Sequence, residues 1–193
     1  MKSKPAAKRF EDCVAERRDM WNMQQYAEPT SKAVDAIVRA IAAGGRIFFF
    51  GNGGSAAQAQ HFAAELSGRF LLERAPWPAL ALSVDTSALT AIANDYGYEH
   101  VFARQLEALA KAGDVALGLT TSGSSANVVN ALRAARKKNV TAIAFSGNGG
   151  GPVAEEAEIA IVGPSGPSWK VQEVHLALGH IMCELVELAL TSL

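Results

Sequence analysis

His61 and Glu65 are a pair of residues whose types and spacing could do chemistry. They stand four residues apart in the segment QAQHFAAEL, so on a helix they share one face. Imidazole and carboxylate are both good ligands for a metal such as zinc, and the same two groups can serve as an acid/base pair. The spacing also describes an exposed intrahelical ion pair, and on spacing alone that simpler alternative is favoured.

A second group of polar residues lies in the apolar segment WKVQEVHLALGHIMCELVELAL. On a helix, Gln172 and His180 project about 80° apart, so both can reach one site on that side. The alternative for His175 or His180 in so apolar a helix is a hydrogen-bonded core residue. Asn94 and Asp95 form another polar pair, after the apolar segment ALTAIA, and their alternative is the end of a helix and a turn.

Two loops rich in glycine and hydroxyl residues could hold an anion. GNGGSA and TTSGSS each follow an apolar run, and TTSGSS carries five hydroxyl groups without lysine or arginine. Glycine lets an anion approach the backbone, and a helix N-terminus adds free N–H groups with partial positive charge. This suits one sugar phosphate better than a triphosphate. GNGGSA lacks the P-loop lysine and the GxGxxG spacing. The alternative for both loops is a tight turn with an N-cap.

The elements that must position these residues alternate between strand and helix. Five short apolar runs predict strands at 46–50, 79–83, 115–119, 141–145 and 159–162. Helices are predicted at 10–26, 30–43 (capped by Thr30 or Ser31), 86–93, 98–111, 126–138, 153–157 and 169–190. This alternation predicts an α/β fold with a parallel sheet of about five strands.

Composition narrows the class of protein. The chain has 193 residues and a net charge of −1, so we expect a single domain and no partnership with nucleic acid or an anionic membrane. No run of about 18 apolar residues is present, so no membrane span is expected. Residues 1–28 offer no apolar core of a signal peptide. Cys13 and Cys183 form no CxxC pattern, which favours reduced thiols in a cytoplasm.

The motifs GNGGSA, QHFAAEL, AIANDYGY, TTSGSSANV and QEVHLALGH, in this order, resemble the sugar isomerase (SIS) domain family. Within it the chain is similar to the sedoheptulose 7-phosphate isomerases, or phosphoheptose isomerases, over nearly its whole length. The resemblance implies a five-stranded parallel sheet between helices, one domain over residues 1–193 and a homotetramer with active sites between subunits. The additional helices of residues 1–45 would take part in oligomer packing.

The resemblance also implies the reaction. It is the aldose–ketose isomerisation of sedoheptulose 7-phosphate to D-glycero-D-manno-heptose 7-phosphate through an enediol, a first step toward the heptose of lipopolysaccharide. Glu65 and His180 match the catalytic acid/base pair. The implied substrate contacts are Asn52, Gly53, Ser55, Asp95, Thr120, Thr121, Ser122, Ser125 and Gln172. One zinc ion per subunit is implied, with the ligands His61, Glu65, Gln172 and His180.

Two alternatives stay open at this point. Trp169 stands where many isomerases of this family have an aspartate that touches the substrate, so another heptose phosphate is an alternative substrate. The family also includes non-enzymatic members that bind the bacterial replication initiator as tetramers. The presence of Glu65, His180 and an intact TTSGSSAN segment favours the enzyme.

Overall fold

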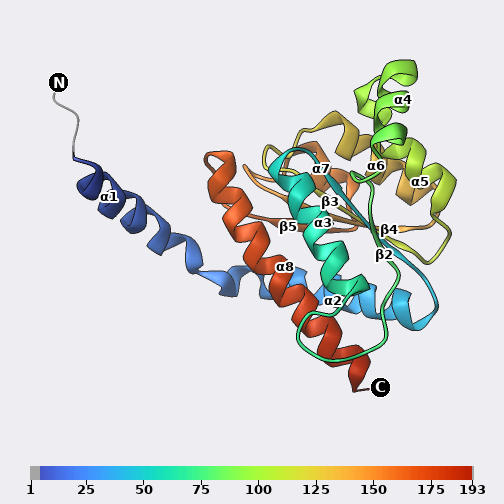
Figure 1. The fold of residues 1–193 in the computed structure, drawn as a ribbon, viewed down its shortest axis with the longest axis horizontal. Helices are drawn as coiled ribbons and strands as arrows, with labels where there is room; N and C mark the ends of the chain where they lie inside the picture. Colours follow the sequence, from blue (N-terminus) through green and yellow to red (C-terminus); the bar gives the residue numbers. More distant parts are fainter. Residues whose placement is uncertain (1–4, 193) are drawn as a thin grey trace.

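The centre of the fold is a parallel β-sheet, seen in the computed structural model, which describes residues 5–192 apart from the side chain of Asp19 (Figure 1). The strands are β1 (Ile47–Gly51), β2 (Ala79–Ala81), β3 (Val115–Leu119), β4 (Thr141–Ser146) and β5 (Ile159–Val162). They stand in the order β2-β1-β3-β4-β5, and all neighbours run parallel. Every residue of β1 and β3 is buried, as expected for strands covered on both faces. The predicted fold class is confirmed.

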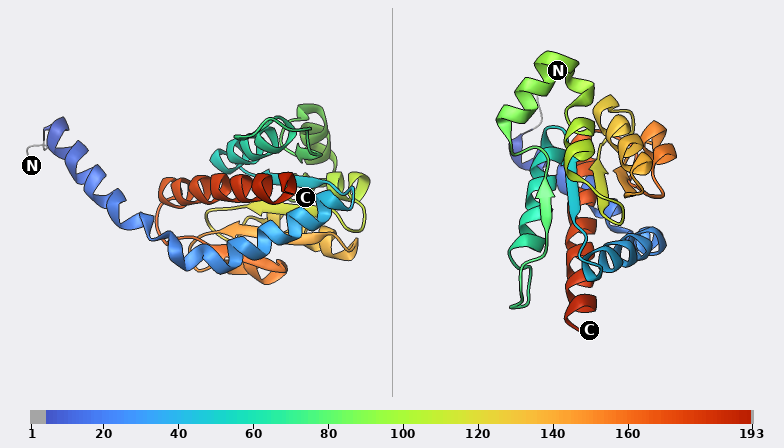
Figure 2. Two further views of the ribbon diagram at one scale, coloured as in Figure 1. Left: turned by 90° about the horizontal axis from the view of Figure 1, so that it is seen from below. Right: turned by 90° about the vertical axis from the view of Figure 1, so that its right-hand side faces the viewer.

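Helices cover both faces of the sheet. The first layer consists of α2 (Ala27–Ala42), α3 (Gly54–Ser67) and α8 (Ser168–Thr191). The second layer consists of α4 (Thr86–Tyr96), α5 (Ala103–Leu109), α6 (Ala126–Lys137) and α7 (Gly151–Glu156). Phe49 packs with the first layer, whereas Phe48 and Phe50 pack with the second, because successive side chains of a strand point to opposite faces. Within the first layer α3 and α8 lie side by side (Figures 1 and 2).

α8 is more apolar than the sequence analysis expected. Its mean hydropathy reaches 1.4 over an 18-residue window, so by length and composition alone it could cross a membrane. In the fold, 44% of that window is buried. Val174, Leu178, Met182 and Val186 of α8 belong to the core that it shares with α2 and α3. Packing between helices and sheet therefore accounts for one side of α8, while Ile181, Leu185 and Leu188 stay exposed.

The N-terminal segment differs from the single helix predicted over residues 10–26. The chain forms α1 (Ala6–Arg18) and then two 3₁₀ turns, η1 (Asp19–Trp21) and η2 (Met23–Tyr26). Asn22 between the turns has φ −76° and ψ 80°, outside the helical region. Met20 and Tyr26 are buried in the core, so burial of these two side chains redirects the chain. α1 itself has no buried residue and projects away from the body (Figure 2).

Other predicted helices also have different boundaries, and two of these differences have a physical reason. α2 begins at Ala27, before the predicted caps Thr30 and Ser31, and carries Pro29 in its first turn, where the missing N–H costs nothing. The segment 98–111 is not one helix, since it divides into the 3₁₀ turn η3 (Tyr98–His100) and α5. Val101 and Phe102 lie between the two elements and are almost fully buried, so their burial interrupts the helix.

The strand order places the two glycine-rich loops side by side. β1 and β3 are neighbours in the sheet, but β1 continues into α3 of the first layer and β3 into α6 of the second. Ligands of open α/β sheets bind at such a point, at the carboxyl ends of the strands. GNGGSA follows β1 and TTSGSS follows β3, so the fold brings both loops to this crevice.

Candidate active site

The first loop brings its backbone close to β3. Gly53 has φ 55° and ψ −120°, a conformation that favours glycine. A Cβ at Gly51 would lie 2.7 Å from the carbonyl oxygen of Leu119, closer than non-bonded atoms approach. These two glycines let the loop turn tightly and begin α3 at the crevice.

The second loop carries a network of hydroxyl groups. Thr120 Oγ1 lies 2.9 Å from Ser125 Oγ and 3.3 Å from Ser122 Oγ. Thr121 Oγ1 lies 3.0 Å from Ser168 Oγ at the start of α8. Each hydroxyl can donate one hydrogen bond and rotate toward an incoming acceptor. The network therefore offers several adjustable donors without a cationic side chain.

These loops enclose a pocket of about 300 Å³ (the hydroxyl pocket). Its wall consists of Asn52, Gly53, Gly54, Ser55, Leu119, Thr120, Thr121, Ser125, Ser168 and Gln172. The pocket thus unites most of the predicted substrate contacts. The sequence analysis missed Ser168, whose only signal was its place as the first hydroxyl residue of the last helix.

Asn52 is bonded to its neighbours more fully than predicted. Asn52 Nδ2 donates to Asn127 Oδ1 at 2.9 Å, and Asn127 Nδ2 donates back to Asn52 Oδ1 at 2.8 Å. The hydroxyl of Tyr98 donates to the same Asn52 Oδ1 at 3.0 Å. Asn127 is buried in the first turn of α6. This amide pair ties the first loop to the helix that follows the second loop.

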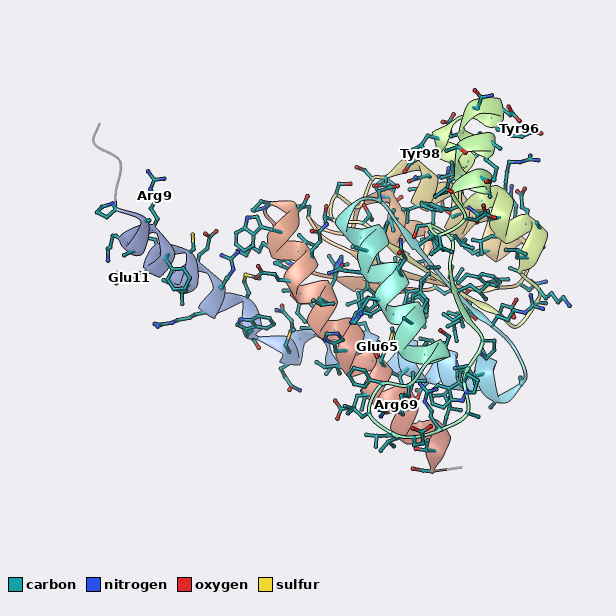
Figure 3. All side chains as sticks on the ribbon, in the orientation of Figure 1. Arg9, Glu11, Glu65, Arg69, Tyr96 and Tyr98 are labelled. Atoms are coloured by element: carbon teal, nitrogen blue, oxygen red, sulfur yellow. The ribbon has the colours of Figure 1, made fainter. Side chains whose placement is uncertain are left out.

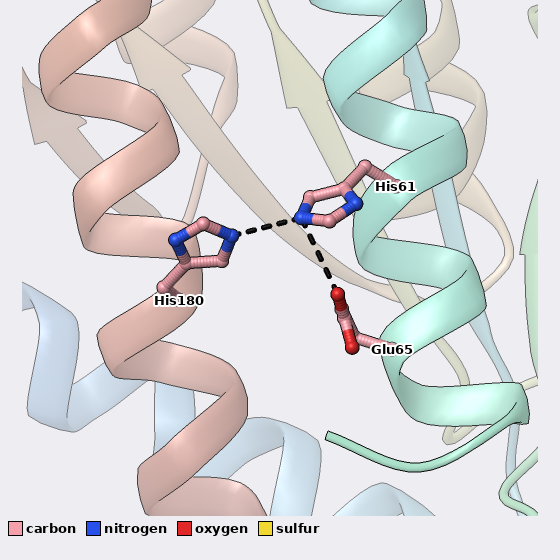
Figure 4. A group of neighbouring side chains, drawn as sticks. All are labelled: His61, Glu65 and His180. Atoms are coloured by element: carbon pink, nitrogen blue, oxygen red, sulfur yellow. Dashed lines mark hydrogen bonds and ion pairs between the residues drawn. The ribbon is translucent and has the colours of Figure 1, made fainter. Parts of the chain in front are cut away.

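His61, Glu65 and His180 form a compact cluster between α3 and α8 (Figure 4). His61 Nε2 lies 2.8 Å from His180 Nε2 and 3.4 Å from Glu65 Oε1. One ligand atom from each residue lies within 4.8 Å of the others. Figure 3 marks the place of Glu65 in the fold, and Figure 4 shows its side chain on the side of α3 that faces α8. The intrahelical pair that the spacing predicted is therefore present, and a third residue from a distant helix joins it.

The cluster has donors that suit a zinc ion. Zinc–nitrogen bonds of about 2.0–2.1 Å in a tetrahedron place neighbouring donors about 3.3 Å apart. The 2.8 Å and 3.4 Å separations are close to that value. Two imidazole nitrogens facing each other also need something shared between them, either a proton or a metal. The three side chains thus fit a metal and leave room for a further ligand.

The hydroxyl pocket and the cluster lie at two positions along the paired helices α3 and α8. Gly54 and Gln172 border the pocket, while His61 is seven residues further along α3 and His180 is eight residues further along α8. At about 1.5 Å rise per residue, the two positions are about 10–12 Å apart. Gln58 Nε2 joins the helices between them by donating to the carbonyl of Gln172 at 2.7 Å.

Gln172, Ser122 and Asp95 differ in their place relative to the hydroxyl pocket. Gln172 borders the pocket, with its amide so close to Gly54 that a Cβ there would lie 2.6 Å from Nε2. Its role as a metal ligand stays a prediction. Ser122 is exposed and bonds to Thr120. Asp95 is exposed near the end of α4, where it accepts a hydrogen bond from Asn94 at 2.8 Å. Within residues 5–192, the pocket wall includes neither Ser122 nor Asp95.

Two further reactive side chains near the site are structural. His175 is fully buried and lies 2.9 Å from the carbonyl of Ser146. Burial lowers the pKa of His175 to about 4, against the opposing hydrogen bond to Ser146. Cys183 is also buried, and this burial, with the nearby negative charge of Glu65, raises the pKa of its thiol to about 12. His175 therefore stays neutral and Cys183 stays protonated at neutral pH.

Trp169 packs against the N-terminal segment. The guanidinium carbon of Arg17 lies 4.0 Å from the centre of the Trp169 ring, and Arg17 Nη2 lies 3.0 Å from Glu173 Oε1. The indole also packs on the first-layer core. Within residues 5–192, the wall of the hydroxyl pocket includes Ser168, the neighbour of Trp169, but not Trp169 itself.

Comparisons with known proteins agree with this geometry. Residues 14–147 match the SIS domain family. The phosphoheptose isomerase of Rhodospirillum rubrum is 50% identical over 166 residues, which cover 86% of this chain and 88% of the relative. The structure of a phosphoheptose isomerase from Neisseria gonorrhoeae has a TM-score of 0.81 at 40% identity, covering 94% and 96% of the two chains. The structure of a phosphoheptose isomerase from Francisella tularensis has a TM-score of 0.84 at 32% identity, covering 93% of this chain and 95% of that one.

Proposed function

The chain belongs to the SIS domain family, and we propose that it is a phosphoheptose isomerase that converts sedoheptulose 7-phosphate to D-glycero-D-manno-heptose 7-phosphate. The observation that carries the proposal is the separation between the hydroxyl pocket and the His61–Glu65–His180 cluster. A phosphate on C7 in the pocket and reacting carbons C1 and C2 at the cluster require an extended seven-carbon chain. The spacing of about 10–12 Å between the two positions along α3 and α8 matches that length.

The hydroxyl pocket holds the phosphate group. The hydroxyls of Thr120, Thr121 and Ser125 face the pocket, and the N-termini of α3 and α6 add backbone N–H groups beside it. Helix N-termini stabilise a phosphate by partial charge and free donors. The phosphate end of the substrate is thereby fixed, and the end with C1 and C2 reaches the cluster.

Glu65 and His180 move the proton. Aldose–ketose isomerisation transfers a proton between C1 and C2 through an enediol, and it needs a base on the carbon and an acid on the oxygen. Glu65 acts as the base and His180 as its partner acid. Their common neighbour His61 holds both, at 3.4 Å from Glu65 Oε1 and 2.8 Å from His180 Nε2.

One zinc ion per subunit is proposed at His61, Glu65 and His180, with Gln172 as a fourth ligand. A bound zinc ion would polarise the carbonyl group of the substrate as a Lewis acid. The donor set of two imidazoles and a carboxylate supports this choice. Gln172 would have to turn its amide from Gly54 toward the cluster.

The test is the coupled assay of isomerisation with Glu65→Gln. We expect turnover to fall below detection while sedoheptulose 7-phosphate still binds, because the amide keeps the shape of Glu65 but accepts no proton. Glu184→Gln, an exposed position of α8, is the matched control and should keep wild-type turnover. Full activity of Glu65→Gln would refute its role as base. Wild-type protein without turnover would contradict the proposed reaction.

A homotetramer is proposed from the exposed apolar surface. α1 buries no residue, and its Phe10 is 70% exposed. Trp21, in the following turn η1, is 51% exposed. Ile181, Leu185 and Leu188 of α8 are exposed as well. Exposed apolar side chains of this kind support association, with residues 1–45 packing between subunits of a single-domain chain.

Light scattering after size exclusion tests the assembly. Wild-type protein should have four times the 20.3 kDa mass of the chain, and Phe10→Asp should shift the distribution to smaller species. A monomeric wild type would contradict the proposal. A cytoplasmic location is also proposed, and the free state of both Cys13 and Cys183 supports it.

A further inference from the structure

Arg74 and Glu187 form a buried ion pair next to the catalytic cluster. Arg74 belongs to the segment between α3 and β2 (residues 68–78, the clamp loop), and Glu187 belongs to α8. Arg74 Nε lies 2.9 Å from Glu187 Oε1, with side chains only 4% and 2% exposed. A buried pair of this kind holds its two elements together, because losing one partner leaves the other charge uncompensated.

Glu187 fixes the backbone of the clamp loop. Its carboxylate accepts the N–H groups of Phe70, Leu71 and Leu72 at 3.2, 2.8 and 2.9 Å. Burial alone would raise the pKa of Glu187, but these hydrogen bonds and Arg74 hold it below its usual value. The carboxylate is therefore ionised at neutral pH and accepts all of these bonds.

Arg74 fixes the end of α3. Its Nη2 donates to the carbonyl of Glu65 at 2.8 Å, and its Nη1 donates to the carbonyls of Leu66 and Gly68 at 3.0 and 3.1 Å. These carbonyls lie at a helix C-terminus, where no helical partner exists and a cation is favoured. The residue whose carboxylate acts as the base is thus held through its own backbone.

Phe70 connects the clamp loop to His180. The two rings stack with centroids 5.8 Å apart and an interplanar angle of 26°. The backbone N–H of Phe70 is held by Glu187, which lies two turns after His180 on α8. The phenyl ring therefore limits the rotation of the imidazole.

We propose that Phe70, Arg74 and Glu187 are positioning residues that hold His180 and Glu65 in their relative orientation. The expected effect on turnover rests on the proposed function. The orientation of His180 and Glu65 does not, because it concerns only the geometry of the cluster. If these three residues had a purely structural role, their loss would lower the thermal stability and leave the chemistry of the folded protein normal. A positioning role predicts damaged chemistry at temperatures where the variant is fully folded.

Phe70→Leu removes the ring and keeps an apolar side chain. We expect kcat to fall by about 10- to 100-fold, as is typical when the support of a site residue is lost, with KM changed by less than about twofold. Phe70→Tyr retains the ring and should restore kcat. Glu73→Ala, in the same loop and with a side chain 90% exposed, should match wild type. Wild-type kcat in Phe70→Leu would overturn the proposal.

Zinc affinity gives a readout that does not depend on turnover. Titration of zinc against a chromophoric chelator should show about 10-fold weaker binding in Phe70→Leu than in wild type or Glu73→Ala. Equal affinity in all three proteins would overturn the proposal even if the protein turned over no sugar phosphate. An inactive wild type with this affinity difference would instead refute only the proposed function.

Glu187→Gln tests whether the effect of Phe70 depends on the bonds between Glu187 and the clamp loop. If it does, the double variant Phe70→Leu/Glu187→Gln loses no more kcat than the more affected single variant. Losses that multiply would contradict a shared route. If Glu187→Gln does not fold, the kcat and zinc results of Phe70→Leu still decide the proposal.

Discussion

Replacing Gly179 by alanine is predicted to separate α8 from α3. A Cβ at this position would lie 2.0 Å from Cζ and 2.2 Å from Cε1 of Phe62. Non-bonded carbons need about 3.5 Å, so the ring or the helix must move by about 1.5 Å. Phe62 is fully buried and cannot turn into solvent. His61 and His180 are the immediate neighbours of these two residues, so the displacement falls on their 2.8 Å contact.

The magnitude follows from two opposing effects. Overpacking of this severity costs about 3 kcal/mol, whereas alanine in a helix interior is about 1 kcal/mol more favourable than glycine. The net loss of about 2 kcal/mol corresponds to a fall in Tm of about 4–8 °C for a chain of this size. A displacement of about 1 Å can cost about 100-fold in rate, so kcat should fall by about that factor at temperatures where the variant is still folded.

Thermal unfolding and the coupled isomerase assay, both on Gly179→Ala, measure these effects. Glu184→Ala, on the exposed face of the same helix, controls for helix propensity and should retain wild-type Tm and kcat. Adding Phe62→Leu to Gly179→Ala removes the overlapping atoms and should recover part of both losses. A Gly179→Ala protein with wild-type Tm and kcat would refute the reasoning, because it would mean that α3 and α8 tolerate a wider separation.

Three other substitutions test the pocket and the clamp. Ser125→Ala should raise KM by about 10- to 100-fold with a smaller effect on kcat, since a hydrogen bond to a charged phosphate contributes about 1.5–3 kcal/mol; an unchanged KM would remove Ser125 from the phosphate site. Asn127→Asp keeps the shape of the side chain but replaces the donor to Asn52 by an acceptor. The free energy of unfolding, measured with urea, should fall by about 1–3 kcal/mol, and no change would show that the amide pair is dispensable. The pKa of Glu187, which lies beside Arg74 and the neutral Cys183 thiol, is lowered in the fold. The ionised carboxylate therefore stabilises the fold above its usual pKa of 4.5. This stabilisation is lost as pH falls through the lower pKa of the folded state. The Tm gap between wild type and Glu187→Gln should therefore be widest at neutral pH and narrow below about pH 4.5; a constant gap would mean that Glu187 is not ionised in the fold.

The fold was predictable where the pattern is local. β1 and β3 are continuous apolar runs, and each ends at a loop of glycine and hydroxyl residues that announces the next helix. The predictions failed where tertiary burial decides the backbone. Met20 and Tyr26 turn the chain after α1, and Val101 and Phe102 interrupt the predicted helix over 98–111. Nothing within a few residues of these side chains signals that they enter the core.

The candidate site was predictable in its parts more than in its arrangement. The shared face of His61 and Glu65 follows from their spacing, but the 2.8 Å approach of His180 joins residues 119 positions apart. The pair Arg74–Glu187 spans 113 positions, and no motif marks either residue. The amide pair of Asn52 and Asn127 likewise depends on β1 and β3 being neighbours. Such contacts are set by topology, which one sequence reveals only through resemblance.

The place of α8 in the chain has a consequence for how the protein is made. All five strands lie before residue 163, and α8, which contributes Ser168, His180 and Glu187, follows them. During synthesis the sheet can form first, with the apolar face that α8 covers open to chaperones and to other nascent chains. A chain cut within residues 163–167 keeps every strand of the described residues and lacks His180, the proposed acid. Premature termination or proteolysis there would therefore give an inert, aggregation-prone protein rather than a weakened enzyme.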